Sequence, residues 1–136
     1  MTLAVATRYS DRIRCAIDMW GLSNFTTFLQ QTSAYRRDFR RMEYGDERNP
    51  EIRSFFDRIS PLNNAHKITR PLFVVQGNND PRVPVAESEQ IVQAVRKNNV
   101  PVWYLLAKDE GHGYSKKKNA DFLFDSIVFF IKTYLL

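Results

Sequence analysis

The sequence has one cysteine and two histidines in 136 residues. A single cysteine cannot form a disulfide within the chain, and the apolar neighbours of Cys15 predict a buried thiol that packs as a small hydrophobic side chain. With His66 and His112 as the other candidate ligands, no cluster has the spacing of a metal site. We therefore expect no disulfide, no metal and no redox role.

Glycine is also scarce, and long apolar runs are missing. The chain has five glycines, and neither glycine-rich pattern that cradles phosphate, G-x-x-x-x-G-K-[ST] or G-x-G-x-x-G, is present, so we expect no cofactor. No apolar run approaches the roughly 20 residues of a membrane-spanning helix, and the N-terminus lacks the pattern of a secretory signal. These absences predict a cytoplasmic protein that does not bind membranes.

The length of the chain predicts a single domain over residues 1–136. Lys and Arg exceed Asp and Glu by 20 to 15, giving a net charge of +5 that would suit a nucleic-acid partner. The densest arginine segment, 36–48, also contains four acidic residues, which is typical of a solvated helix face of mixed charge. The lysines at 116–118 are typical of a solubilising surface. We therefore expect no nucleic-acid partner.

The second half of the chain alternates between strand and helix patterns. An apolar run at 72–75 predicts a buried strand over 72–76, and a second run predicts one over 102–106. Between them, a helix is expected at about 84–97, with Pro84 in its first turn. A last helix is expected to start from Asn119 as N-cap and to dock on the sheet. Its predicted apolar stripe consists of Phe124, Ile127, Val128, Ile131 and Leu135.

The first half of the chain is less regular. Residues 3–9 have a helical pattern, residues 13–18 a strand pattern, and residues 25–58 a largely helical pattern interrupted near Gly45 and Pro50. Together with the second half, this order implies right-handed crossovers and a parallel sheet. The predicted fold class is α/β, with a short parallel sheet of about three strands flanked by helices.

Two polar loops follow the predicted strands at 72–76 and 102–106. The first contains Asp80 and the second contains His112 between two glycines. Because the carboxyl ends of parallel strands gather ligands and catalytic groups, Asp80 could orient His112 as a base. The alternative is that Asp80 caps a turn and His112 is an ordinary loop histidine, and spacing alone does not separate the two.

The sequences of these loops resemble those of a known family. The segments 77–84, G-N-N-D-P-R-V-P, and 103–113, W-Y-L-L-A-K-D-E-G-H-G, look like the catalytic Asp and His signatures of the prolyl oligopeptidase family of serine peptidases. Residues 70–136 resemble the C-terminal end of the α/β-hydrolase catalytic domain in that family. Ser60-Pro61-Leu62 and Ile17-Asp18 also recur in such proteins, so the resemblance covers nearly the whole chain.

The resemblance implies a role for three residues. Asp80 would orient the histidine, and His112 would be the general base of a Ser-Asp-His triad that acts on a peptide or ester substrate. Arg82 matches a position that helps to hold the carbonyl of the substrate. A surface ion pair is an equally good interpretation of Arg82, because a guanidinium suits both contacts.

The nucleophile that this chemistry needs is missing. Hydrolases of this fold place the serine in G-x-S-x-G, whereas Ser23 has Gly21 two residues before it but Phe25 two after. Ser115 follows Gly113 but precedes Lys117. Residues 1–7 look like the helix that follows the serine in the family. We therefore expect a C-terminal portion of the catalytic domain that lacks the nucleophile elbow and is inactive alone.

The same resemblance implies an incomplete sheet. The strand at 13–18 would normally pair with a strand that the chain lacks, which leaves backbone groups beside Ile13, Cys15 and Ile17 unpaired. Such an edge predicts a homo-oligomer or a partner chain that pairs with it. The alternative function is therefore a non-catalytic binding or oligomerisation domain derived from an α/β-hydrolase.

Overall fold

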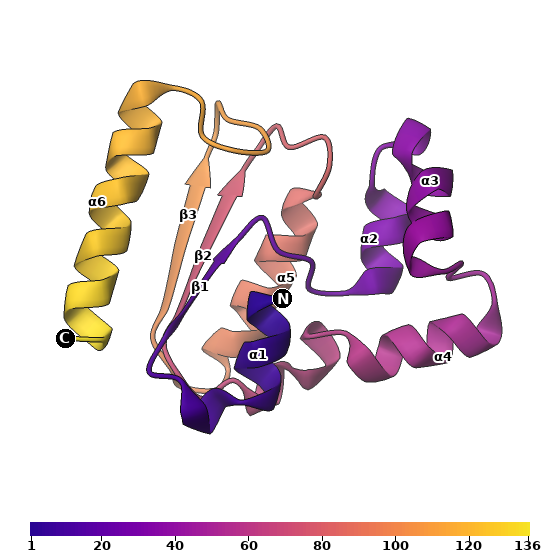
Figure 1. Ribbon diagram of the computed structural model, residues 1–136, viewed down its shortest axis with the longest axis horizontal. Helices are drawn as coiled ribbons and strands as arrows, with labels where there is room; N and C mark the ends of the chain where they lie inside the picture. The colour runs from indigo at the N-terminus through magenta and orange to yellow at the C-terminus, as the bar shows by residue number, and fades with distance from the viewer.

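A three-stranded parallel sheet forms the centre of the computed structural model, which describes residues 1–136. Its strands are β1 (Ala16–Met19), β2 (Leu72–Gly77) and β3 (Val102–Ala107), in the order β1-β2-β3 (Figure 1). Ala16 lies opposite Leu72, and Leu72 lies opposite Val102. The α/β prediction is confirmed, including the number of strands.

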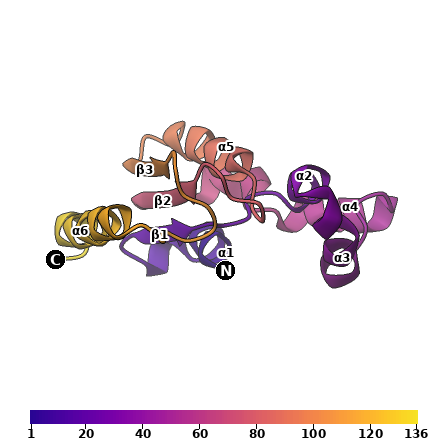
Figure 2. The same cartoon turned by 90° about the horizontal axis from the view of Figure 1, so that it is seen from above.

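Helices cover both faces of this sheet. The helix α6 (Lys117–Tyr134) lies on one face, and α1 (Thr2–Arg8) and α5 (Val85–Arg96) lie on the other. The helices α2 (Phe25–Gln31), α3 (Ala34–Tyr44) and α4 (Pro50–Ile59) lie further out, beyond α1 and α5 (Figures 1 and 2). Two short 3₁₀ helices, Ser10–Arg12 and Leu62–Lys67, complete the chain. None of the helices is both long enough and apolar enough to cross a membrane.

The central strand β2 is buried along its whole length, as the apolar run at 72–75 predicts. Leu72 and Val74 pack into the core shared with α1 and α5. Phe73 and Val75 point to the other face and pack against α6. The alternation of side chains along one strand therefore divides the core into two layers.

The edge strand β1 is shorter than predicted, because it begins at Ala16 rather than Ile13. The backbone N–H of Ala16 donates to the carbonyl of Pro71 at 2.9 Å. Proline has no N–H to return to the neighbouring strand, so the ladder cannot extend further toward Ile13. Cys15 is half-buried beside the α6 layer, and burial raises the pKa of its thiol.

Two helices start at positions other than those predicted. Pro84 is the N-cap of α5 and not a residue of its first turn. The N-cap of α6 is Lys116, and Asn119 lies inside the helix, where its amide donates to Asp109 and Glu110. The carboxylate of Glu110 accepts the backbone N–H of Lys116, so a side chain from the preceding loop caps this helix.

The face of α6 that packs on the sheet is also different from the prediction. The buried or half-buried residues that contact the sheet layer are Leu123, Ile127, Phe130 and Tyr134. Phe124, placed by the sequence on the apolar stripe, is 66% exposed, and Leu135 is exposed as well. Because α6 has apolar residues on most of its circumference, periodicity alone does not determine which of them meet the sheet.

The sequence pattern predicts that the charged face of the arginine-rich helix α3 is solvated, but one of its arginines, Arg41, is largely buried. The side chain of Arg41 is 16% exposed and pairs with the buried Glu47. On the opposite side, Tyr35, Phe39 and Met42 are exposed at helical spacing. The mixed-charge interpretation of segment 36–48 is therefore wrong for Arg41 and Glu47, whose ion pair joins α3 to the loop before α4.

Candidate active site

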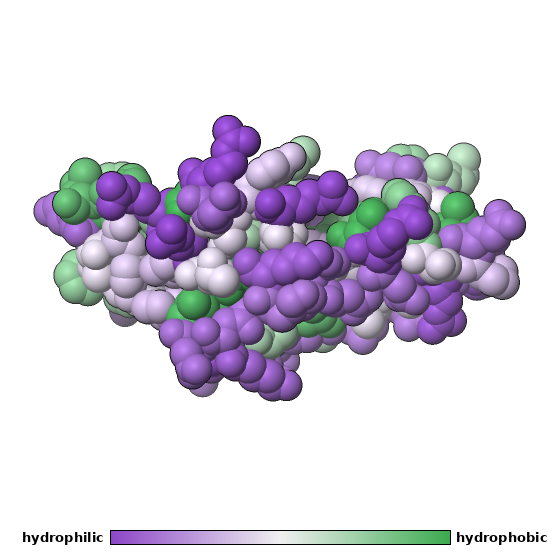
Figure 3. Space-filling view, turned by 90° about the horizontal axis from the view of Figure 1, so that it is seen from below, coloured by the Kyte–Doolittle hydropathy of each residue, from purple (hydrophilic) through white to green (hydrophobic).

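The loops that follow β2 and β3 lie side by side at the carboxyl end of the sheet (Figure 1). The backbone N–H of Asn78 donates to Ala107, and that of Asn79 donates to Glu110. A Cβ at Gly77 would lie 2.1 Å from the carbonyl oxygen of Gly111, so only glycine permits this approach. The opposite end of the molecule presents a mainly hydrophilic surface (Figure 3).

Asp80 and His112 meet between these two loops. Their Oδ2 and Nδ1 atoms are 2.8 Å apart, the Asp80 side chain is fully buried, and the His112 side chain is 31% exposed. Oδ1 of Asp80 accepts the backbone N–H groups of Arg82 and Val83, which fixes the carboxylate. An ionised carboxylate only accepts hydrogen bonds, so in the neutral imidazole Nδ1 carries the proton and Nε2 has a free lone pair.

The buried Glu110 holds the loop that carries His112. Its carboxylate accepts the backbone N–H groups of Ser115 and Lys116 at 3.1 and 2.9 Å and the amide of Asn119 at 2.8 Å. These hydrogen bonds, with that of Asn119 the strongest, lower the pKa of Glu110. Sequence reasoning missed this residue, although an acidic residue shortly before an amphipathic helix is a possible capping signal.

Trp20 is the third residue at this end of the sheet, and sequence reasoning missed it too. It directly follows β1, donates its backbone N–H to Val75, and has a φ of +55°, which is uncommon for a bulky residue. Its ring lies 5.7 Å from the His112 ring and 6.0 Å from that of Tyr114. The available signal was its position at the end of a parallel strand, the same one that identified Asp80 and His112.

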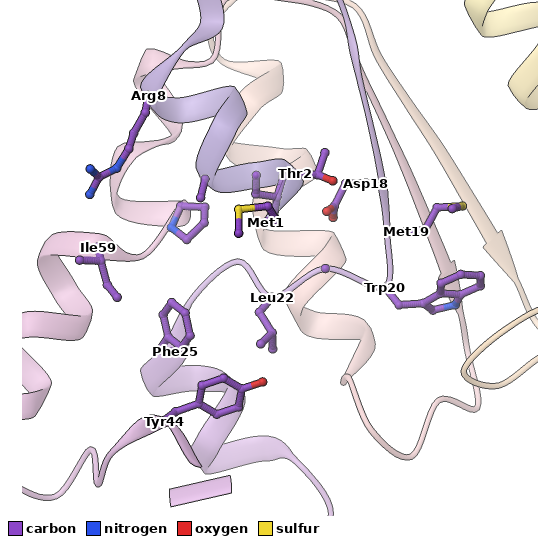
Figure 4. A pocket seen from close by; sticks show the side chains of 14 residues that line it. Met1, Thr2, Arg8, Asp18, Met19, Trp20, Leu22, Phe25, Tyr44 and Ile59 are labelled. Carbon is purple, nitrogen blue, oxygen red and sulfur yellow. The ribbon is translucent and has the colours of Figure 1, made fainter.

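A cavity of about 590 Å³ adjoins Trp20 and separates α1 from the start of α2 (Figure 4). Leu22, Phe25 and Tyr44 give it a mainly apolar wall. Asp18 also lines it, although this side chain is 4% exposed and its Oδ2 has no hydrogen-bond partner. Burial raises the pKa of Asp18 from 3.8 to about 6.

We expect the Asp18→Asn variant to be more stable than the unchanged chain at pH 7.5 and equally stable near pH 4. The folded chain retains a proton on Asp18 up to about pH 6, whereas the unfolded chain loses it near 3.8, so stability falls as pH rises through that window. The gain at pH 7.5 should be roughly 1–3 kcal/mol. Urea denaturation at both pH values measures it, and an equal gain at pH 4 would contradict this account.

Arg82 and the serines complete the list of candidate residues. The Arg82 side chain is exposed, and it takes part in none of the eight ion pairs, so the surface ion pair considered for it is absent. Ser23 hydrogen-bonds to Glu87 and Ser115 to Glu110. Ser88 hydrogen-bonds to Val85 and Tyr104. His112 has no hydrogen bond to any serine of the chain.

A model of the prolyl oligopeptidase family matches residues 1–136. The chain belongs to the prolyl oligopeptidase family. It is 41% identical over 123 residues to dipeptidyl aminopeptidase BIII of Pseudoxanthomonas mexicana, and these cover 87% of the chain and 18% of that protein. Dipeptidyl peptidase family member 6 of Caenorhabditis elegans is 39% identical over 123 residues, with 88% of the chain and 17% of that protein covered. The chain thus spans less than a fifth of the length of these relatives.

Solved structures of two peptidases have the same fold. A puromycin-hydrolyzing peptidase of Mycobacterium tuberculosis superimposes with a TM-score of 0.85 at 26% identity, over 99% of this chain and 20% of that one. The acylaminoacyl peptidase of Pyrococcus horikoshii superimposes with a TM-score of 0.85 at 19% identity, over 96% of this chain and 22% of that one. The sheet and its helices are therefore part of the α/β-hydrolase fold of these peptidases.

Proposed function

We propose that this prolyl oligopeptidase family chain provides the catalytic Asp80 and His112 of a serine peptidase. The observation that carries the proposal is the 2.8 Å contact between the buried Asp80 carboxylate and Nδ1 of His112. The contact leaves Nε2 as a proton acceptor on a half-exposed ring at the carboxyl end of the sheet. We further propose that residues 1–136 form one piece of a catalytic domain, and that the nucleophilic serine lies outside them.

The proposed reaction uses the two ring nitrogens of His112 for different tasks. Nε2 accepts the proton of the serine hydroxyl as the serine oxygen attacks the carbonyl carbon of the substrate, and the same nitrogen then gives that proton to the leaving amine. Asp80 holds the Nδ1 proton in place and stabilises the imidazolium that forms in between. Water then hydrolyses the acyl-enzyme by the same proton transfers in reverse.

Two neighbouring side chains are proposed to bind the substrate. Arg82 has an exposed guanidinium on the loop of Asp80 with no ion-pair partner, which suits a hydrogen bond to a peptide carbonyl. Trp20 forms an aromatic wall beside the imidazole, on the side of the apolar cavity. An aromatic wall next to the reacting atoms favours an apolar group on the substrate.

A chimera tests the proposed function. This chain would replace the matched residues of dipeptidyl aminopeptidase BIII, whose name indicates release of dipeptides from an amino terminus. We expect the chimera to hydrolyse a chromogenic dipeptidyl amide and to react with a fluorophosphonate probe, and the isolated chain to do neither. Labelling of Ser23, Ser88 or Ser115 in the isolated chain, lost in His112→Ala, would overturn the proposal.

The open edge of the sheet supports a second proposal, that this edge binds another β-strand. Ala16 and Trp20 direct their N–H groups toward β2, so the intervening odd-numbered residues, Ile17 and Met19, direct theirs away from it. Unpaired groups of this kind are a template for strand addition in a homo-oligomer or a complex with a partner chain. The association would use residues 15–19.

We expect the isolated chain to self-associate, and Met19→Pro to weaken that association. Proline removes the outward N–H of Met19 without breaking a hydrogen bond to β2. Met19→Ala keeps the N–H and is the control for the lost side chain. Sedimentation equilibrium over a range of concentrations measures the effect, and a chain that stays monomeric at the highest concentration would exclude this use of the edge.

A further inference from the structure

Glu87, in the first turn of α5, is a fully buried acidic residue that pairs with no cation. Its Oε2 accepts the backbone N–H groups of Ser23 and Asn24, each at 2.9 Å. Its Oε1 accepts the hydroxyl of Thr27 and the amide of Gln90. Each oxygen thus has donors of its own, and the positive ends of α2 and α5 both face the carboxyl group.

These hydrogen bonds join two segments of the candidate active site. Ser23 lies three residues after Trp20, and α5 starts directly after the loop that contains Asp80. The other end of α2 is tied to the same loop, because the hydroxyls of Thr32 and Ser33 donate to the carbonyls of Arg82 and Pro81 at 3.0 and 2.8 Å. The helix α2 is therefore attached at both ends to the segment that holds Asp80.

We propose that Glu87 is a positioning residue that sets where Trp20 lies relative to His112. The inference rests on the proposed function, because it assigns Glu87 to the shape of the substrate-binding wall beside the catalytic imidazole. Trp20 has a strained backbone, and its N–H is held by Val75. The anchor that follows it is Ser23, whose N–H and hydroxyl both bond to Glu87 and whose carbonyl accepts the N–H of Leu62.

Replacing Glu87 with methionine breaks this arrangement. Glu87→Met keeps the length of the side chain but has no oxygen, so the buried N–H groups of Ser23 and Asn24 lose their acceptor. Glutamine would not test the contact, because its oxygen can accept these N–H groups while its NH₂ donates to the hydroxyl of Thr27. The released segment can relax the positive φ of Trp20. Asp80 is held by other groups, namely the N–H groups of its own loop, so its bond to His112 should survive.

Nuclear magnetic resonance of the full 136-residue chain measures both contacts separately. Cross-relaxation between the Trp20 indole and His112 ring protons reports the aromatic contact, and a far-downfield Nδ1 proton reports the bond to Asp80. We expect Glu87→Met to lose the first signal and keep the second. Glu89→Met, on the same helix but with an exposed side chain that forms no hydrogen bond, is the matched control and should keep both.

A second control separates positioning from general loss of stability. Phe130→Leu weakens the α6 layer, far from α2, and should retain the Trp20 to His112 signal at a melting temperature as low as that of Glu87→Met. If Glu87→Met does not fold, Thr27→Val removes one donor to Glu87 and should weaken the same signal. An intact signal in the folded Glu87 or Thr27 variant, or its loss in Phe130→Leu, overturns the inference. Absence of the downfield proton in the unchanged chain would instead contradict the proposed function.

Discussion

The Asp80→Asn substitution in the chimeric peptidase should lower kcat by about 10⁴-fold and leave KM nearly unchanged. The two backbone N–H groups of Arg82 and Val83 keep the amide oxygen of the new side chain on their side. Its NH₂ group then faces Nδ1 of His112, which must accept a hydrogen bond, and the ring proton moves to Nε2. A protonated Nε2 cannot take the proton of the serine, so the base is lost although the geometry is kept.

Steady-state kinetics on a chromogenic dipeptidyl amide measure this loss. Asp121→Asn is the matched control, because Asp121 is an exposed carboxylate on α6 that pairs with Lys117. Its kcat should equal that of the unchanged chimera. If the Asp80→Asn enzyme retains a tenth or more of the kcat of the unchanged chimera, its kcat is on the order of 10³-fold above the expected value. Asp80 would then stabilise its own turn and not orient the imidazole.

The Phe130→Ala substitution should destabilise the chain by about 3–5 kcal/mol. Phe130 is fully buried, and its ring centroid lies 4.9 Å from Tyr134, 5.3 Å from Trp103 and 5.4 Å from Phe73. Removing the ring leaves a cavity between α6 and the sheet that rigid strands cannot close. Urea denaturation followed by far-ultraviolet circular dichroism measures the free energy of unfolding.

Phe124→Ala, on the same helix, is the control for this experiment. Its ring is 66% exposed, so its removal should change the free energy of unfolding by no more than about 0.5 kcal/mol. The pair distinguishes the face of α6 that the structure buries from the face that periodicity favours. Equal losses in the two variants would mean that α6 packs with the Phe124 stripe against the sheet.

Sequence patterns were sufficient where one physical requirement dominated. The run at 72–75 has apolar residues at every position, which suits a strand covered on both faces, and β2 has that place. The pattern failed on α6, where Leu123 and Phe124 are equally apolar neighbours. The choice between them depends on the aromatic rings of Phe73 and Trp103 on the sheet, which local periodicity does not contain.

The same division applies to the candidate site. Asp80 and His112 could be named because each follows a recognisable strand and lies in a segment that resembles a catalytic signature of the family, and the structure brings them together at 2.8 Å. Glu87 could not be named, because its backbone donors, the N–H groups of Ser23 and Asn24, become its neighbours only in the folded chain. Glu110 lies shortly before a helix, which is a possible capping signal. An acidic residue in a helix or loop is usually solvated, however, and nothing in the sequence indicates that either residue is buried.

The close approach of Gly77 to Gly111 has a consequence for motion at this end of the sheet. With backbone against backbone and ladder hydrogen bonds running into both loops, Asp80 and His112 belong to one rigid body. A fluctuation that separates Asp80 from His112 would have to break the hydrogen bonds between β2 and β3, and such openings are rare in a packed domain. The timescale on which such a site changes shape is then set by residues that approach it from other elements, such as Trp20, whose ring lies 5.7 Å from that of His112.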